Sequence, residues 1–178
     1  MQKSLSLWQL AGFIFTLAAG TLLHFLYDWT NQSILFAPFS AVNESVWEHM
    51  KLLFFPMFLF ALVENQRFGE QYEHFWCAKL AGILLGLILI PVLFYTYTGV
   101  FGVSLHWANI GIFFLASAAA YLLETRLLRH NRIFCHSPQA ALFVLCLLAL
   151  AFMVFTFVHP DIPLFEEPTA SVFGFCPF

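Results

Sequence analysis

Four of the chain's seven histidines fall near the ends of long hydrophobic segments, at what we infer below to be one level of a membrane. Ionisable side chains are costly inside a bilayer, so their convergence at one level indicates a functional site. Imidazole nitrogens, together with carboxylate oxygens or water, are the ligands that catalytic zinc ions take. We therefore predict a metal site, with zinc as the candidate cofactor, whose ligands are His24, His49, His106 and His159.

The densest group of polar residues is the segment NESVWEHMK, which begins at Asn43. On a helix, Glu48 and Lys51 share one face, and His49 lies on a face about 100° away. We predict that Glu48 is a general base, and that Lys51 stabilises an oxyanion or holds Glu48 in place. Glu44 and Asp28 are the further candidate catalytic carboxylates. The other polar residues that we expect at the site are Asn43, Ser45, Asn109 and Asp161.

Helix capping is the structural alternative for the same segment. Asn43 or Ser45 can serve as the N-cap, and Ser45 followed three residues later by Glu48 matches a capping box. Acidic side chains at a helix start also interact favourably with the helix dipole. Capping leaves His49 and Lys51 unexplained, so we favour a functional role for the segment.

The first hydrophobic segment carries small or polar residues at every fourth position: Gly12, Thr16, Gly20, His24 and Asp28. This spacing follows one ridge of a helix, and the small residues allow a neighbouring helix to approach closely. His24 and Asp28 can touch, as an imidazole does when a carboxylate orients it for metal binding or base catalysis. The alternative is a hydrogen-bonded pair between helices at the water boundary.

The composition indicates a membrane protein with an all-α fold. Of its 178 residues, 61% are hydrophobic and only 10% are charged, whereas about a quarter of the residues are charged in average globular chains. Seven Lys and Arg against ten Asp and Glu leave no basic excess, which argues against nucleic acid as a partner. We predict one polytopic domain over residues 1–178, with a bundle of five transmembrane helices. The predicted spans are 7–29, 45–63, 75–95, 105–123 and 139–158.

The distribution of cations predicts which way the helices run. Lys3, Arg67 and the three arginines of residues 126–132 fall on one side, and the loops 30–43 and 96–104 contain no Lys or Arg. The positive-inside rule then places the N-terminus inside and the C-terminus outside. We expect a multi-pass protein of the bacterial cytoplasmic membrane, with the first hydrophobic segment retained because it has no clear cleavage site.

The inner side of the chain gives weaker signals. Glu64 and Glu124, with the arginines near them, are interpreted as membrane anchors and surface pairs, and the inner and middle parts of the spans hold few other ionisable groups. The four cysteines form no CxxC pair and no disulfide framework by their spacing. We interpret them as structural, because residues 77, 135 and 176 do not share a membrane level. They are Cys77, Cys135, Cys146 and Cys176.

Three motifs resemble those of a group of small bacterial integral membrane proteins of unknown function. They are HFLYDW at residues 24–29, NESVWEHMK at 43–51 and HPDIPLF at 159–165. The resemblance covers essentially the whole chain and implies that the polar elements belong together. Ser45 and His49 also have the spacing of a zinc-binding element in ceramidase-type membrane hydrolases. That family has seven spans and a late His-x-x-x-His element, which this chain lacks, so the likeness implies at most an analogous site.

Three functions remain open from the sequence. The first is a metal-dependent hydrolase or transferase acting on a lipid or small amphiphile. The second is a proton- or cation-linked transport or binding protein, which with five helices requires a homo-oligomer or a partner. The third is an accessory membrane protein whose polar cluster fixes helix packing. Polar groups confined to one level favour the enzyme over a pathway through the membrane.

Overall fold

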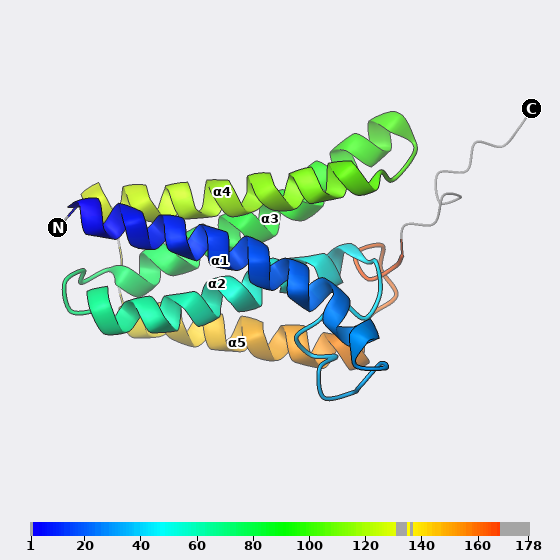
Figure 1. Cartoon of the computed structure of the whole chain (residues 1–178), viewed down its shortest axis with the longest axis horizontal. Coiled ribbons are helices and arrows are strands. Elements are labelled where there is room, and N and C mark those ends of the chain that lie inside the picture. Colours follow the sequence, from blue (N-terminus) through cyan, green and yellow to red (C-terminus); the bar gives the residue numbers. More distant parts are fainter. Residues whose placement is uncertain (1, 131–134, 136, 168–178) are drawn as a thin grey trace, which may run out of the picture.

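The structure, a computed structural model, describes residues 2–130, 135 and 137–167. Within these residues the chain forms a bundle of five helices in which consecutive helices run in opposite directions (Figure 1). Each helix is long and apolar enough to span a membrane, which confirms the predicted all-α fold with five apolar helices. The helices are α1 (Gln2–Trp29), α2 (Val46–Phe68), α3 (Phe75–Phe101), α4 (His106–His130) and α5 (Pro138–Phe157).

Several helices extend beyond the predicted spans. The span predicted to end at 63 continues as α2 to Phe68, the span predicted to end at 95 continues as α3 to Phe101, and the span predicted to end at 123 continues as α4 to His130. Hydropathy marks only the apolar part of each helix. Backbone hydrogen bonds carry the helix on through polar residues at its end.

We distinguish the two ends of the bundle by the direction of α1. The proximal end is where α1 begins, and the distal end is where α1 finishes (Figure 1). Helix α2 packs against all four other helices, whereas α1 packs against α2 and α4, and α5 packs against α2 and α3. Helix α2 is therefore central in the bundle and contacts every other helix.

The small residues on α1 bring it close to α2, as their spacing predicts. A Cβ atom added to Gly20 would lie 2.8 Å from the carbonyl oxygen of Leu52 on α2. That carbonyl has lost its usual helical donor, because Pro56 has no N–H. A Cβ atom on Gly12 would lie 2.6 Å from the ring of Phe60. Close approach at these glycines sets the position of the next turn of α1, which carries His24.

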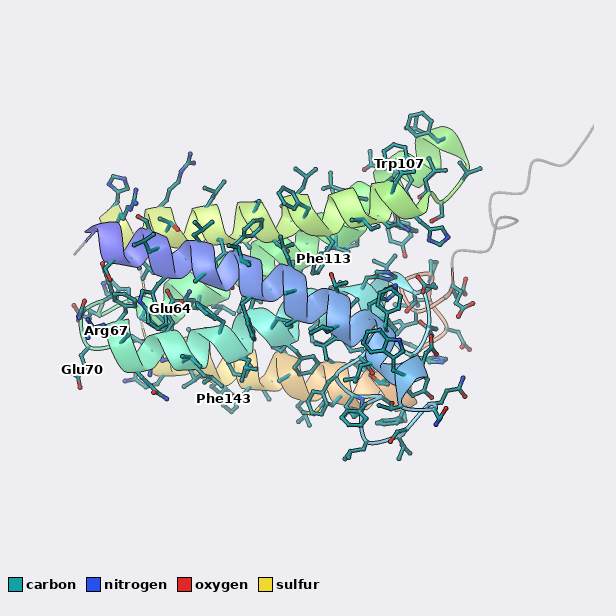
Figure 2. All side chains as sticks on the ribbon, viewed as in Figure 1. Glu64, Arg67, Glu70, Trp107, Phe113 and Phe143 are labelled. Atoms are coloured by element: carbon teal, nitrogen blue, oxygen red, sulfur yellow. A yellow bond between two sulfur atoms is a disulfide. The ribbon has the colours of Figure 1, made fainter. Side chains whose placement is uncertain are left out.

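Much of the outer surface of the bundle is apolar. Trp107 is 73% exposed and Phe143 is 63% exposed, and Figure 2 shows both side chains projecting away from the helices. Large apolar side chains on α1, α2 and α3 are exposed in the same way, among them Leu7, Leu59 and Ile88. Soluble monomers rarely expose apolar surface on this scale, so the surface suits a lipid environment.

A disulfide at the proximal end corrects one prediction. Cys77, near the start of α3, is bonded to Cys135, which precedes α5, and their Cα atoms are 6.0 Å apart. The expectation that the cysteines form no disulfide was wrong, because spacing in the sequence does not show that the start of α3 and the segment before α5 meet. Cys146 is a free thiol, and Cys176 lies outside the described residues.

The acidic residues at the proximal end correct a second prediction. Glu64 and Glu124 were expected at the surface, but they are 0% and 1% exposed and both contact the buried Lys79. Figure 2 shows Glu64 within the bundle, while Arg67 and Glu70 lie at its rim. The prediction of surface position holds for Arg67, which is exposed.

Candidate metal centre

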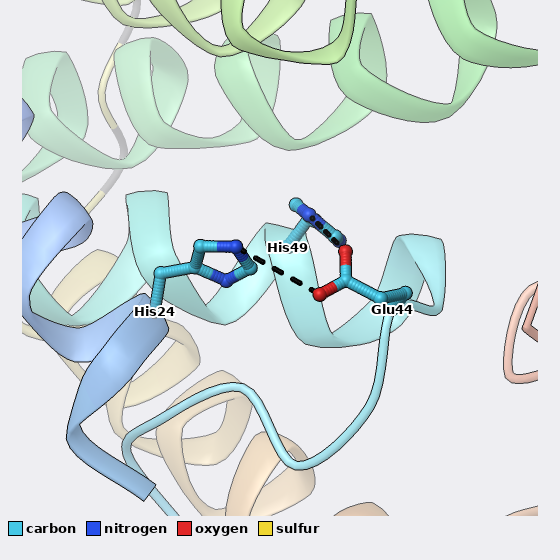
Figure 3. A group of neighbouring side chains, drawn as sticks. All are labelled: His24, Glu44 and His49. Carbon is cyan, nitrogen blue, oxygen red and sulfur yellow. Dashed lines mark ion pairs between the residues drawn. The ribbon is translucent and has the colours of Figure 1, made fainter. Parts of the chain in front are cut away.

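His24, Glu44 and His49 meet at the distal end of the bundle (Figure 3). The three side chains come from different elements: the last turns of α1, the loop before α2, and the first turn of α2. Nε2 of His24 lies 3.8 Å from Oε1 of Glu44, and Nε2 of His49 lies 3.5 Å from Oε2 of Glu44. One ligand atom from each of the three residues lies within 4.8 Å of the other two.

These separations suit a shared metal ion better than direct hydrogen bonds. Donor and acceptor atoms in protein hydrogen bonds are usually 2.7–3.2 Å apart. Ligand atoms about 2.0–2.2 Å from a tetrahedral zinc ion lie about 3.3–3.6 Å from one another. The distances of 3.5 and 3.8 Å are close to that range. Two imidazoles and one carboxylate also form one of the ligand sets found in catalytic zinc sites, with a fourth position left for water.

The backbone of α2 orients the ring of His49. Its Nδ1 lies 2.9 Å from the carbonyl oxygen of Ser45. A carbonyl can only accept, so Nδ1–H donates and the neutral ring keeps its lone pair on Nε2, the atom that faces Glu44. Ser45 is the N-cap of α2, as the sequence predicts, because its hydroxyl accepts a hydrogen bond from the N–H of Glu48. Ser45 therefore positions His49.

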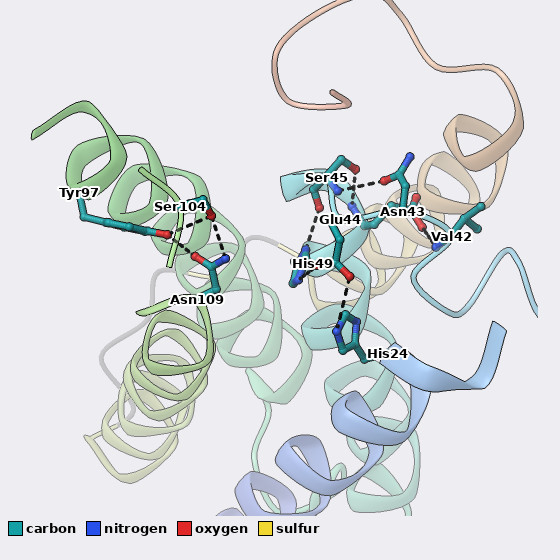
Figure 4. A network of polar contacts seen from close by, with 10 residues as sticks. His24, Val42, Asn43, Glu44, Ser45, His49, Tyr97, Ser104 and Asn109 are labelled. Atoms are coloured by element: carbon teal, nitrogen blue, oxygen red, sulfur yellow. Dashed lines mark hydrogen bonds and ion pairs between the residues drawn. The ribbon is translucent and has the colours of Figure 1, made fainter. Parts of the chain in front are cut away.

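Asn43 fixes the turn that presents Glu44. Its side-chain oxygen accepts a hydrogen bond of 3.0 Å from the N–H of Ser45, an arrangement typical of Asx turns. Glu44 then follows as the last residue before the N-cap, and its side chain is 52% exposed. Figure 4 shows this turn and the carboxylate extending from it toward the histidines.

The contact between α1 and α2 brings His24 beside His49. The two ring centroids are 5.4 Å apart, and Gly20, one turn earlier, allows α1 to approach α2 this closely. The spacing of residues on α1 predicts that His24 pairs with Asp28. In the structure the carboxylate that faces His24 is that of Glu44, whereas Asp28 is exposed and Nδ1 of His24 has no hydrogen-bond partner.

A cavity of about 510 Å³ opens beside the three residues. This volume is within the range that binds small molecules. Its polar lining includes His24, His49 and Glu44, and much of the remaining lining is apolar. A smaller hollow of about 30 Å³ adjoins Glu44 and His49 and has room for water or one ion. The apolar lining comes from α1, α2 and α4 and comprises Gly20, Phe25, Leu52, Ile110 and Phe113.

Helix α4 adds His106 and Asn109 to the same cavity. Asn109 is held in place, because its side-chain oxygen accepts a hydrogen bond from the hydroxyl of Tyr97 and its amide donates to Ser104 (Figure 4). His106 is exposed and lines the cavity without belonging to the group of three ligands. We interpret it as a candidate for a fourth ligand or a proton acceptor, because it lines the same cavity.

Glu48 and Lys51 lie on the other side of α2 and form a buried ion pair of 2.7 Å. Glu48 also accepts a hydrogen bond of 2.8 Å from the N–H of Val42. Lys51 donates to the carbonyl of Ala37 and to the hydroxyl of Thr156. The pair therefore joins the loop before α2 to α5. Neither residue lines the 510 Å³ cavity, so we assign both to holding the site in shape rather than to contact with a substrate.

His159 and Asp161 lie in the segment after α5 and are exposed. The ring of His159 faces Phe165, with centroids 6.2 Å apart. The carbonyl of Leu164 accepts a hydrogen bond from the N–H of Trp47, so this segment covers the start of α2. The three sequence motifs do come together at the distal end, but His159 is not one of the three grouped ligands.

Sequence reasoning missed two parts of this end. Tyr97 was not among the predicted site residues, but its hydroxyl donates a hydrogen bond to Asn109 and orients it. The apolar wall of the cavity, formed in part by Ile110 and Phe113, was not predicted either. No signal in the sequence indicates this role of Tyr97. Its hydroxyl reaches the start of α4 only because of the path of the loop between α3 and α4.

The chain matches the model of a family of unknown function (DUF6512) over residues 1–175, and it therefore belongs to that family. No curated protein and no solved structure matches the chain.

Proposed function

We propose that this member of the DUF6512 family is a membrane protein that binds one zinc ion through His24, Glu44 and His49 and acts as a hydrolase or transferase on a lipid or other amphiphile. The observation that carries the proposal is the grouping of two imidazoles and one carboxylate within 4.8 Å at the wall of a 510 Å³ cavity. A ligand set with a vacant coordination position beside a cavity is the arrangement expected of a catalytic metal site.

The proposal places the bundle in a bacterial cytoplasmic membrane with the distal end outside. Five helices of sufficient length and apolarity support this placement. The cations outside the helix centres favour the proximal end as the cytoplasmic side, because Arg67, Arg126 and Arg129 lie there. The zinc site then lies at the outer surface, where an amphiphile in the outer leaflet can reach the cavity with its head group.

The disulfide between Cys77 and Cys135 weighs against this orientation, because cytoplasmic thiols are kept reduced. The cation distribution is the stronger argument, since it involves several residues in separate loops. We therefore expect both cysteines to be thiols in the growing cell and to pair when the protein is oxidised. We expect a membrane-impermeant thiol reagent to label Cys77 and Cys135 in inside-out vesicles but not in intact cells.

The chemistry follows from the groups that line the cavity. His24, Glu44 and His49 would hold the zinc ion, which would supply an acidified water and would polarise a carbonyl or phosphoryl oxygen. His106, which lines the same cavity, would be the candidate general base and acid. Asn109, held by Tyr97, is placed to orient the polar head of the substrate. The apolar walls near Phe25 and Ile110 suit an acyl or alkyl chain.

Proton- or cation-linked transport is the second candidate function. The observation that favours it is the second buried group of ionisable residues, around Lys79 at the proximal end. The sequence favoured an enzyme because its ionisable residues were expected at one level of the membrane. Ionisable groups at both ends remove that reason. The apolar core residues between the two ends argue instead against a continuous polar pathway through the bundle.

Metal analysis tests the proposal. We expect protein purified in mild detergent to bind about one equivalent of zinc, and His49→Ala to bind none. His159→Ala is the matched control, since this histidine lies at the same end but outside the grouped ligands, and it should bind zinc normally. Zinc-dependent cleavage of a panel of ester and phosphodiester amphiphiles, lost in His49→Ala, would support the enzyme. Absence of bound zinc in the unmodified protein would reject the metal site.

A further inference from the structure

A second group of ionisable side chains is enclosed near the proximal end of the bundle. Lys79 of α3 contacts the carboxylates of Glu64 on α2 and Glu124 on α4. Gln9 of α1 donates a hydrogen bond of 2.7 Å to Glu64. These four residues are at most 3% exposed. Four helices therefore contribute one side chain each to a single buried cluster, which we call the proximal cluster.

The charges of the proximal cluster do not balance when every group is ionised. It contains one ammonium group and two carboxylates, which gives a net charge of −1. An uncompensated charge enclosed in an apolar environment is strongly unfavourable. The other titratable group facing the cluster is Tyr121 on α4, whose ring centre is 5.8 Å from Nζ of Lys79 and which adds no positive charge. Among the described contacts, α1 contributes only the neutral Gln9.

A metal ion does not suit this position. Nζ of Lys79 already occupies the space between the two carboxylates, 2.6 Å from Oε2 of Glu124 and in contact with Oε2 of Glu64. The rings of Phe75 and Tyr121 flank the same ammonium group, with centres 5.4 and 5.8 Å from Nζ. The smallest cation that restores charge balance is a proton, which needs no additional space.

The hydrogen bonds of the cluster also lack donors. Three buried acceptors of the cluster have no hydrogen-bond partner: Oε1 of Glu124, Oε1 of Gln9 and Oε2 of Glu64. Of these, Oε2 of Glu64 contacts the ammonium group of Lys79, whereas the other two oxygens have no such contact. Buried polar atoms are usually paired, so acceptors without donors indicate that a proton belongs in the cluster.

From this charge count and geometry, we propose that the proximal cluster is a proton-binding site in which Glu64 and Glu124 together hold one exchangeable proton beside Lys79. A cavity of about 420 Å³ between α1 and α4 is lined by Gln9 of the cluster and by Tyr121, and we assign proton entry to this side. Most of its lining is apolar, and Ser6, Thr125 and Arg129 are its other polar or charged residues. The site takes up a proton from the proximal side and becomes neutral, and it returns to a charge of −1 when the proton leaves.

This proposal does not depend on zinc binding at the distal end. It concerns different residues, and its test uses a different signal. If the protein is a proton-linked transporter, the proximal cluster is the site at which the proton is bound. If the protein is an enzyme, the same site links the stability of the bundle to the protonation of its buried carboxyl group.

Infrared difference spectroscopy of the purified protein tests the proposal, because a protonated carboxyl group has a C=O stretching band distinct from that of a carboxylate. We expect one such band at neutral pH, and we expect it to shift after transfer to D₂O. Both Glu64→Gln and Glu124→Gln should abolish the band. Each leaves one carboxylate opposite one ammonium group, so the cluster is neutral without an added proton.

Glu48→Gln is the matched control, because Glu48 is a buried glutamate paired with a lysine in a group whose charges already balance. The band should persist in this variant. Circular dichroism establishes that each variant is folded, and the glutamine variants keep the size of the original side chain. Absence of the band in the unmodified protein, its survival in either proximal variant, or failure to shift in D₂O would overturn the proposal.

Discussion

The two ends of the bundle each hold a group of ionisable residues, and the spacing of the groups differs. At the distal end, Nε2 of His24 and Nε2 of His49 lie 3.8 and 3.5 Å from the carboxylate oxygens of Glu44, and the three residues face a cavity. At the proximal end, Lys79 already fills the space between Glu64 and Glu124. Open lone pairs beside a cavity can receive a metal ion, whereas a closed cluster with excess negative charge can take only a proton. The distances between the side chains therefore favour a metal ion at the distal end and a proton at the proximal end.

A third group shows what a purely structural pair looks like in the same molecule. Lys51 and Glu48 balance each other's charge, and Lys51 directs its donors to Glu48, Ala37 and Thr156. Nothing in this pair calls for an additional ligand. Lys51 therefore faces one carboxylate that balances its charge, whereas Lys79 faces two carboxylates and leaves a net charge of −1.

The largest effect is expected from Lys79→Met, which leaves two buried carboxyl groups without their cation. Removing one partner of a buried ion pair costs about 3–5 kcal/mol, and we expect a loss in this range in the free energy of unfolding in detergent. The triple variant that adds Glu64→Gln and Glu124→Gln should recover much of the loss. A loss below about 1 kcal/mol for Lys79→Met would contradict the charge assignment.

Lys51→Met should cost less, about 3 kcal/mol, at the lower end of the range for a broken buried pair. It leaves one carboxylate instead of two, and Glu48 keeps its hydrogen bond from Val42. The same unfolding assay measures the effect, with Lys51→Met combined with Glu48→Gln as the charge-balanced control. If Lys51→Met proved more damaging than Lys79→Met, the difference between the two lysines would be the reverse of our account.

A smaller effect, about 1–3 kcal/mol, is expected from Gly82→Ala. A Cβ atom at Gly82 would lie 2.7 Å from Oε1 of Glu124, so the enclosed carboxyl group would have to move. Gly111→Ala on α4 is the matched control, since nothing lies within 4 Å of its added Cβ atom. The control should be neutral or stabilising by up to about 1 kcal/mol. Equal losses in the two variants would mean that Gly82 serves only general helix packing.

The smallest effect concerns the distal end, where His106→Ala should weaken zinc binding by about tenfold, the low end of the range for residues that support a metal site. His106 lines the cavity without belonging to the three grouped ligands. Competition with a zinc-sensitive dye measures the affinity, and His159→Ala serves as the control with unchanged binding. A larger loss in His159→Ala than in His106→Ala would show that the exposed segment after α5 reaches the site.

The helices and part of the distal site were predictable from the sequence. Long apolar segments indicate the five helices, and the spacing of Gly20 and His24 on one ridge predicts a close approach to a neighbouring helix. That approach is what brings His24 to His49. Which histidines converge was not predictable, because this depends on helix rotation and on loop paths. His159 differs from the others because the segment after it folds over the start of α2.

The proximal cluster was missed because each of its charged residues lies near a polar loop in the sequence. Such residues are commonly at the surface, and hydropathy does not show which face of a helix they occupy. One signal was present: Lys79 and Gly82 are three residues apart and share a face of α3. A glycine there leaves room for a large side chain from the neighbouring helix, and in the structure that side chain is Glu124.

X-ray absorption spectroscopy of the protein loaded with one equivalent of zinc is the decisive measurement of whether zinc binds His24, Glu44 and His49. We expect a first shell of only nitrogen and oxygen atoms at about 2.0–2.2 Å, with the outer scattering of two imidazoles. His24→Ala should remove one imidazole from that pattern. A shell containing sulfur at about 2.3 Å, or one without imidazole, would contradict the account.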